Sequence, residues 1–430
     1  MKSRLLFLTV LFSLVTNTLP ALANDDGVLF GMERRRDQFR KDFGYFFYPL
    51  SGSVPGIGTA YGAGGTVTNI GGTDTDITGF YITGDFSASG VAILNYHLLQ
   101  DRVIFDIANY TASVAAKSYT RGIDSSKDDF LHVRVDSEVT ATQLTYSNFN
   151  RQLELYARYG FGSQRIKEVI DSDGNAFENV DSSRKYFQAL VFGFSLDVTD
   201  DRQDPRMGSR LEIKDRMTFL ERGNSSAYDV LDVNLTYYHP VGETSVWAFN
   251  AYYSTALITA KGITDRDQMR AEQGLQCDTI ADPEEKANCQ QTENTLLDML
   301  IAQNIHGQAT ALGGTQRLRS YPMGRYYAGQ AVAYGTELRW NLTDENTEVD
   351  WFIIRGLRTN IQLAFFADIG SVADSTGDLH KNMKTSVGTG LRILFTGVTI
   401  RLDVATGDEG TEMQLMLDYP WSMFSVDSPI

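Results

Sequence analysis

The chain has 430 residues, with 38 basic against 54 acidic side chains and a formal net charge of −16. Such an acidic excess repels polyanions, so nucleic acid is not expected as a partner. Beyond the first two dozen residues, no window approaches the roughly 18 apolar residues of a membrane-spanning helix. A helical membrane protein is therefore excluded, and a secreted soluble protein or a β-barrel remains.

The N-terminus has the pattern of a secretory signal peptide. Two basic residues precede the apolar run 5–15, and Ala21-Leu22-Ala23 supplies small residues for cleavage. The alternative, a membrane anchor, would need a longer run of roughly 20 residues. We expect a signal peptide over 1–23 and a short periplasmic segment over 24–56. Without Lys2 and Arg4 the mature chain carries 36 basic and 54 acidic residues, a net charge of −18.

Strict alternation of apolar and polar residues then predicts β-strands. Val398, Ile400 and Leu402 are apolar, whereas Thr399, Arg401 and Asp403 between them are polar. The same pattern recurs at 131–139, 153–161, 247–257 and 413–419. A soluble β-sandwich also alternates, but here the polar faces hold ions of both signs and the segments suit a tilted membrane strand of about 9 to 11 residues. We therefore predict an all-β, antiparallel transmembrane β-barrel over 57–421.

The strand count sets the expected size of the barrel. About fifteen segments lie between 57 and 421, and because bacterial single-chain barrels have even strand numbers, we predict 16 strands. The missing strand is expected in the glycine-rich stretch before Tyr81. Gly62, Gly64 and Gly65 are expected on the first strand, paired with the last strand at 413–419. There they would either weaken the seam or relieve strand curvature.

The connection 261–326 is long and polar, which predicts an extracellular loop. Within it, Leu296, Leu297, Leu300 and Ile301 repeat at helical spacing and predict a helix over 293–305, either a packed loop cap or a membrane or partner helix. Cys277 and Cys289 lie close together in an exported chain. We expect them to form a disulfide, with two free thiols as the alternative.

Five motifs in order carry a family resemblance. The loop ends in Gly313-Gly314-Thr315-Gln316-Arg317-Leu318-Arg319-Ser320-Tyr321. The other four are Asp201 to Gly208, Glu337-Leu338-Arg339, Phe366-Ala367-Asp368-Ile369-Gly370, and Gly388 to Arg392 followed by Ile400 to Asp403. Together they resemble the bacterial surface-antigen family of outer-membrane barrels, which includes barrel-assembly, translocation-assembly and two-partner-secretion proteins.

The resemblance implies that this long loop folds back into the lumen, with Gly313, Gly314, Leu318 and Ser320 in its tip. Ser320 stands where the family has glycine, and serine would be strained at a positive φ. Alternation places Glu337 and Asp368 in the lumen with Phe366, at the strand signature that ends in Gly370. Arg319, beside Tyr321, is expected to contact both carboxylates as a plug contact. Alternatively, the two acids belong to a general charge network of the lumen.

No nucleophile elbow, zinc-protease helix or P-loop occurs, and the histidines lack metal-ligand spacing. We expect no catalytic residue, cofactor or metal. A membrane-embedded hydrolase using His132 as base is the alternative.

Three functions remain open for an outer-membrane location. The first is assembly, insertion or translocation of proteins or lipids, the second a passive or gated pore, and the third a structural barrel that docks a periplasmic partner. Expected partners are outer-membrane lipid, lipopolysaccharide and a periplasmic protein or client polypeptide. The segment 24–56 is too short for the periplasmic repeats of the family's assembly members. Trp421 or Phe424 must serve as the terminal aromatic residue, before a tail over 422–430.

Overall fold

The computed structural model describes residues 34–35, 37–39, 43–54, 57–172, 174, 182–219, 225–273, 277–343, 348–351, 354–395, 398–417 and 419–421. The expected signal peptide over 1–23, Phe424 and the tail over 422–430 lie outside these residues.

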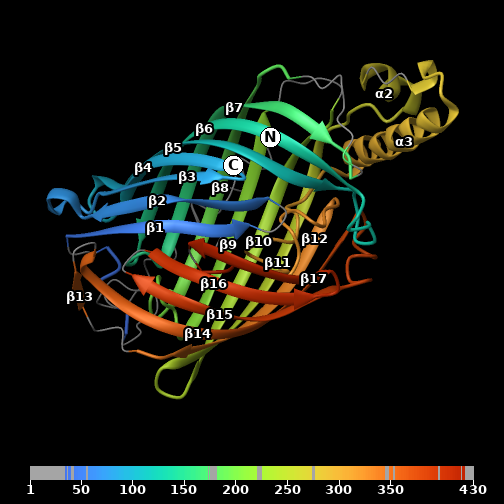
Figure 1. The fold of residues 1–430 in the computed structure, drawn as a ribbon. Coiled ribbons are helices and arrows are strands. Elements are labelled where there is room, and N and C mark those ends of the chain that lie inside the picture. Colours follow the sequence, from blue (N-terminus) through green and yellow to red (C-terminus); the bar gives the residue numbers. More distant parts are fainter. Residues whose placement is uncertain are drawn as a thin grey trace.

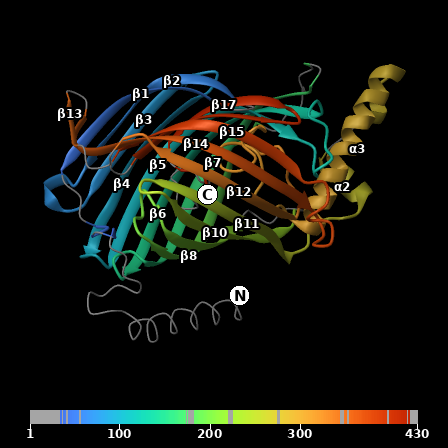
Figure 2. The same ribbon diagram turned by 90° about the horizontal axis from the view of Figure 1, so that it is seen from below.

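The described strands form an antiparallel, nearly closed barrel with a wall of 16 strands (Figures 1 and 2). This confirms the predicted fold class. A further short strand, β13, pairs with the start of β14. The strands are β1 Gly44–Val54, β2 Gly58–Thr68, β3 Asp76–Gly84, β4 Ser87–Leu99, β5 Val103–Tyr119, β6 Phe130–Asn148, β7 Leu153–Ile170, β8 Lys185–Thr199, β9 Gly208–Phe219, β10 Ala227–Val241, β11 Ser245–Ala260, β12 Gln330–Asn341, β13 Glu348–Trp351, β14 Ile354–Ala373, β15 Lys384–Phe395, β16 Val398–Gly407 and β17 Gly410–Leu417.

The two faces of the wall follow the alternation in the sequence. On β12, Trp340 is 55% exposed on the outer face, whereas its neighbour Arg339 is fully buried on the inner face. The same contrast separates Phe365 from Phe366 on β14. Because successive side chains of a strand point to opposite faces, this pattern gives β12 and β14 an apolar outer face and a charged inner face. The alternation at 131–139 is reversed in the structure, since Val139 of β6 is buried and Glu138 lies on the outer face with Ser163.

The position of the first strand corrects two expectations. β1 begins at Gly44, inside the range 24–56 that we expected to precede the barrel. Gly62, Gly64 and Gly65 lie on the second strand, β2, which pairs with β1 and β3 rather than with the last strand. Between 57 and 421 the wall has fifteen strands, and β1 is the sixteenth.

The glycines of β2 have a packing reason. A Cβ atom at Gly64 would lie 2.7 Å from the ring of Tyr48, and one at Gly65 would lie 2.5 Å from the ring of Phe47. Aromatic side chains of β1 therefore cover the backbone of β2 on both faces of the sheet. This cross-strand covering of glycine by aromatic rings keeps the pair of strands packed.

The long connection between β11 and β12 carries α2 Arg266–Gln273, the short 3-10 helix η3 Cys277–Thr279 and α3 Pro283–His306, which project beyond one end of the barrel (Figures 1 and 2). α3 is longer than the predicted 293–305. It begins where the Asp282 carboxylate accepts from the backbone N–H groups of Glu284 and Glu285. Its last turn bonds to the end of the wall, because Ser226 N donates to Asn304 Oδ1 over 2.8 Å.

Over the described residues, no helix is both long and apolar enough to cross a membrane. Another short 3-10 helix, η2 Ile70–Gly72, lies in the turn between β2 and β3.

Cys277 and Cys289 are bonded in this loop, 12 residues apart. Such a bond restricts the unfolded loop by about 3 kcal/mol in the chain-entropy model. We predict that intact protein resists thiol alkylation until it is reduced, and that replacing both cysteines with serine frees the helical loop to proteolysis while the barrel stays heat-modifiable. Two alkylatable thiols in non-reduced protein would contradict the prediction.

Candidate functional site

The long loop re-enters the barrel after α3. Leu312 and Tyr326 exchange two backbone hydrogen bonds of 2.8 and 3.0 Å, and Gly314 N donates to Tyr321 O over 2.9 Å. Gly313 and Gly314, with φ of 100° and 103°, reverse the chain at the start of the tip. We call residues 310–326 the plug. Its side chains bond to β10, β12, β14 and β16, which surround it, so it lies in the lumen.

Arg319 is the centre of a buried ionic cluster in the lumen. Its Nε atom lies 2.9 Å from Asp368 Oδ2, and its Nη1 atom lies 2.8 Å from Glu337 Oε2 and 3.3 Å from Asp403 Oδ2. The structure therefore brings Arg319 together with both carboxylates chosen from the sequence. Its guanidinium also stacks on the ring of Phe366, with Cζ 3.4 Å from the ring centroid.

Three arginines of the wall complete the cluster. Arg339 Nε lies 2.9 Å from Glu337 Oε1, and Arg392 Nη2 lies 3.1 Å from Glu337 Oε2. Arg401 Nη1 lies 3.0 Å from Asp403 Oδ2, and Arg392 also pairs with Asp403. All of these side chains are at most 1% exposed. The ionic cluster thus comprises Arg319, Arg339, Arg392, Arg401, Glu337, Asp368 and Asp403.

The charge count of the ionic cluster depends on the plug. With Arg319 inserted, four guanidinium groups face three carboxylates. Several nitrogens of Arg339 and Arg401 are buried without a hydrogen-bond partner. Without Arg319, the wall residues of this cluster would hold three positive and three negative charges. The formal charges of these wall residues would then be equal in number, but Asp368 would lose its paired cation, which is costly for a buried carboxylate.

The strand signature at 366–370 faces the plug at every second residue. Phe366 stacks on Arg319 and Asp368 pairs with it, while Gly370 leaves room for the plug. A Cβ at Gly370 would lie 2.9 Å from Leu312 Cδ1 and 3.0 Å from Val332 O. The ring of Phe366, the carboxylate of Asp368 and the missing side chain of Gly370 therefore form one continuous surface of β14 that contacts the plug.

Ser320 is accommodated without the strain that its replacement of glycine suggested. The positive φ in this part of the tip belongs to Leu318, at 52°, and not to Ser320. Ser320 N donates to Ser386 Oγ over 2.9 Å, and Tyr321 OH donates to Thr385 O over 3.1 Å. A Cβ at Gly407 would lie 2.3 Å from Ser320 Oγ. The glycine at the end of β16 therefore leaves the space that the Ser320 side chain occupies.

The end of the plug next to the turn between β16 and β17 is held by a second set of charges. Arg325 is fully buried, and its Nη2 atom lies 2.8 Å from Glu409 Oε1. At the outer rim Arg121 pairs with Asp374, whose Oδ1 accepts from Gly329 N over 2.8 Å. Burial opposes ionisation of Asp374, but the hydrogen bonds from Arg121 and Gly329 hold its pKa below the usual value.

Trp421, in the described segment 419–421, enters the lumen from the opposite side. Trp421 is 2% exposed; its backbone N donates to Gln316 Oε1 over 2.6 Å, and its O accepts from Asn234 Nδ2 over 2.7 Å. A Cβ at Gly335 would lie 2.6 Å from the indole ring. Trp421 is therefore an inner contact of the plug, and not an aromatic residue of the lipid-facing surface as its expected terminal role required.

The mouth of the barrel opposite α2 and α3 has further polar contacts. Arg34 Nη1 lies 3.0 Å from Asp200 Oδ2, and Asp204 Oδ1 accepts from Gln362 Nε2 over 2.9 Å and from Tyr419 OH over 3.1 Å. The turn between β8 and β9, which matched the acidic turn motif, thus reaches across the lumen to β14. It also binds the segment before β1 through Arg34.

One histidine lies in a grouping that spacing did not suggest. Nδ1 of His97 lies 3.9 Å from Asp74 Oδ2 and 3.5 Å from Asp101 Oδ1, close enough for a metal ion to be held. The Gln100 amide donates to both carboxylates, over 3.1 and 2.7 Å, and Asp101 N donates to His97 Nδ1. These bonds already engage the atoms that a metal would use.

Sequence reasoning missed Asp403 as a partner of Arg319, and Arg392 and Arg401 as members of the ionic cluster, although their strands were matched to the family. The signal was present: each alternates with outward residues such as Leu391 and Leu402, which places it in the lumen. Trp421 gave no such signal, because its burial depends on contacts far away in the sequence.

No protein-family model matches the chain, and no curated protein matches it. Among solved structures, CdiB from Escherichia coli is similar with a TM-score of 0.51 and 10% identity over 87% of this chain and 62% of that chain. The fold is that of an outer-membrane β-barrel. BamA from Haemophilus ducreyi lacking POTRA domains 1-3 gives a TM-score of 0.47, with 12% identity over 87% of this chain and 69% of that chain. CdiB from Acinetobacter baumannii gives a TM-score of 0.47, with 9% identity over 88% of this chain and 60% of that chain.

We predict that Gly335→Val expels Trp421 from the lumen, since the added side chain overlaps the indole ring. Iodide should then quench more of the tryptophan fluorescence, and the gain should vanish when Trp421→Phe is added. Gly377→Val is a matched control, because a Cβ there meets only Ser375 Oγ at 4.0 Å. Equal quenching in Gly335→Val and wild type would show that Trp421 does not occupy this place.

Proposed function

We propose that this protein is a member of the bacterial surface-antigen family, a gated outer-membrane barrel that takes part in assembly, insertion or translocation of proteins or lipids. The plug is its gate. The observation that carries the proposal is the charge count of the ionic cluster. The wall residues of the cluster hold equal numbers of charges without Arg319 and are suited to release the loop, whereas a permanent plug would be matched by an equal number of acids.

The contacts at the two ends of the plug support a gate that can be reached from both sides of the membrane. Arg325 and Glu409 connect it to the extracellular end, and Gln316 connects it to Trp421 near the periplasmic side. A periplasmic protein or client chain that displaced the segment around Trp421 would remove one support of the tip. We propose such a partner, with lipid and lipopolysaccharide around the wall, and no catalytic role.

A pore is the second candidate function, because withdrawal of the plug would also open the lumen to small solutes. The two functions differ in their requirement for a partner. Cross-linking at the periplasmic mouth in intact cells, through a photoreactive residue at Gln38, should capture a periplasmic or client polypeptide if the barrel assembles or translocates. Repeated capture of lipid alone, with normal solute passage, would favour the pore.

We predict that Arg319→Ala loosens the plug and raises single-channel conductance in planar bilayers. Breaking a buried pair costs about 3 to 5 kcal/mol when a charge is left alone, but here Glu337 and Asp403 retain arginine partners, so the loss falls mainly on Asp368. Asp368→Asn should have a similar effect, and the double variant should be less than additive. Additive changes in conductance would mean that the two residues act independently.

Arg401→Gln should have the opposite effect to Arg319→Ala and hold the plug more firmly. Removing this wall cation leaves three guanidinium groups and three carboxylates with Arg319 inserted, and it frees Asp403 to pair more fully with Arg319. We therefore predict fewer openings than in wild type. Lys381→Gln, which removes an exposed loop cation, serves as the control. If Arg401→Gln opened the channel as Arg319→Ala does, the charge balance would not be what governs the gate.

A further inference from the structure

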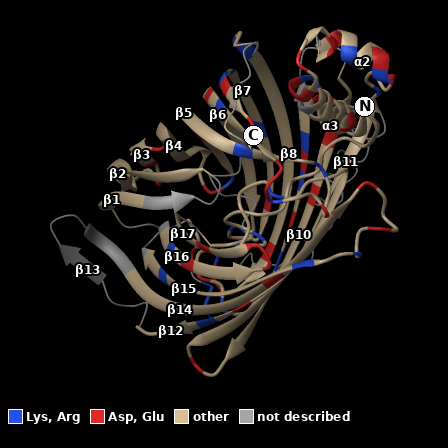
Figure 3. Ribbon diagram, turned by 45° about the vertical axis from the view of Figure 1, so that its right-hand side comes forward, with Lys and Arg blue, Asp and Glu red and all other residues tan. Residues whose placement is uncertain are grey.

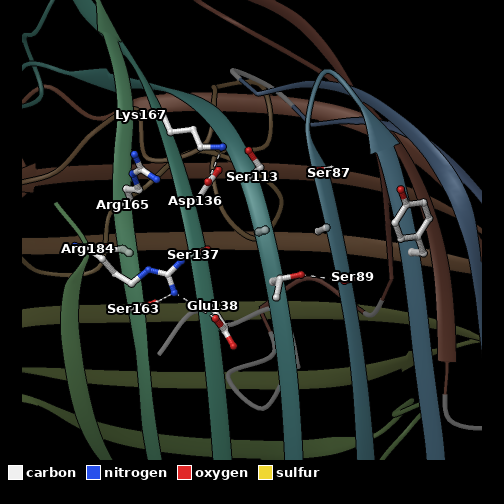
Figure 4. Close-up of a pocket in the computed structure, with 15 residues that line it drawn as sticks. Ser87, Ser89, Ser113, Asp136, Ser137, Glu138, Ser163, Arg165, Lys167 and Arg184 are labelled. Carbon is white, nitrogen blue, oxygen red and sulfur yellow. Dashed lines mark hydrogen bonds and ion pairs between the residues drawn. The ribbon is translucent and has the colours of Figure 1, made fainter. Parts of the chain in front are cut away.

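A polar pocket interrupts the outer surface of the barrel near its extracellular rim. It has a volume of about 490 Å³ and lies over β3 to β7 and the start of β8 (Figure 4). One row of paired residues crosses it on the same face of the sheet: Tyr81, Ser89, Thr111, Glu138, Ser163 and Tyr186. Tyr81 and Tyr186, at the two ends of the row, are 61% and 73% exposed.

The outward direction of this pocket follows from the strands beneath it. On β7, Phe161 and Tyr159 continue the face of Ser163 toward the short turns, and both are exposed. The alternate residue Arg158 donates to Gln143 Oε1 on the inner face. The pocket therefore lies directly above the apolar belt, at the end of the barrel that carries the long loops.

The lining combines three cations with hydroxyl groups. Arg165, Lys167 and Arg184 point into the pocket region beside Asp136 and Glu138, as Figure 4 shows. Lys167 Nζ lies 2.6 Å from Asp136 Oδ2 and Arg184 Nη1 lies 3.6 Å from Glu138 Oε2, in pairs that are a third or more exposed. Exposed pairs of this kind are weak, so their cations can exchange a carboxylate for a phosphate. The hydroxyl groups come from Ser87, Ser89, Thr111, Ser113 and Ser163.

We propose that this pocket binds the phosphorylated sugar headgroup of an outer-leaflet glycolipid, the chemistry of lipopolysaccharide. Three cations and a ring of hydroxyls match phosphate and sugar oxygens, and exposed tyrosines at both sides suit the membrane interface. Apolar residues next to the pocket, such as Val91 and Phe161, would contact the acyl chains. The inference rests on the proposed outer-membrane location, but not on the plug or on transport.

The test uses full-length protein in detergent and a bis-phosphorylated, acylated glucosamine disaccharide as the probe. Wild type should bind it, and Arg165→Gln/Lys167→Gln/Arg184→Gln should weaken binding by about ten-fold or more. A control with three other cations removed, Arg134→Gln/Arg266→Gln/Lys286→Gln, should stay near wild type, since none of the three lines the pocket. Heat-modifiability checks that both variants are folded.

Two further arms identify the ligand. The dephosphorylated glycolipid should bind as weakly as the pocket variant does, and inorganic phosphate should not displace the intact lipid. Equal binding by wild type and pocket variant, or by phosphorylated and dephosphorylated lipid, would overturn the proposal. Displacement by inorganic phosphate would make the pocket a simple anion site. Because no conductance is measured, failure here leaves the gate proposal standing, and failure of the gate leaves this one standing.

Discussion

The arrangement of the lumen depends on one buried guanidinium group, that of Arg319, which cannot bond to solvent and must find its partners in the protein. Arg319 is fully buried, yet it reaches carboxylates on three strands, β12, β14 and β16. A buried arginine requires such partners, and buried carboxylates in turn require cations. The loop tip and this side of the wall therefore determine each other's side chains. The aromatic ring under Arg319 and the glycines around the tip follow from the same need for close approach.

The barrel is closed from both ends by segments that do not belong to its wall. The plug enters beneath α2 and α3, and Trp421 enters at the other end of the barrel, where the acidic turn between β8 and β9 also crosses the lumen. Glycine makes room for each of them, Gly370 for Leu312 and Gly335 for the indole ring. Because the segments meet at Gln316, movement of one changes the support of the other. This coupling follows from direct contact and needs no long-range pathway.

The wall could be predicted from the sequence because alternation is a local property. On β12 and β14 the alternation shows which residues face outward, and that parity sufficed to place Glu337 and Asp368 in the lumen. On β6 it gave the reverse, because Glu138 shares the outer face with Ser163 whereas Val139 is buried. β1 was missed because its residues 45–48 are aromatic on both faces of the sheet; two of these rings, Phe47 and Tyr48, cover glycines of β2. The first ten residues of α3 lack apolar spacing, although the Asp282-Pro283 start was visible in the sequence.

What could not be predicted depends on distant partners. The excess of arginine in the ionic cluster appears only when β12, β15 and β16 are brought around the plug. The burial of Trp421 likewise needs Asn234 and Gly335, which lie on strands far from the chain end. The outer pocket needs six neighbouring elements, from β3 to β8, to align its hydroxyls and cations. No single segment contains these sites.

The central claim is that the plug must leave the wall for the barrel to open. It is tested most directly by Ser320→Cys/Ser386→Cys in a background without the two native cysteines, because Ser320 N and Ser386 Oγ lie 2.9 Å apart in the closed state. Oxidation should lock the tip to β15. The account predicts that single-channel openings disappear in the oxidised protein and return on reduction. Openings of normal frequency and size in the locked protein would contradict it.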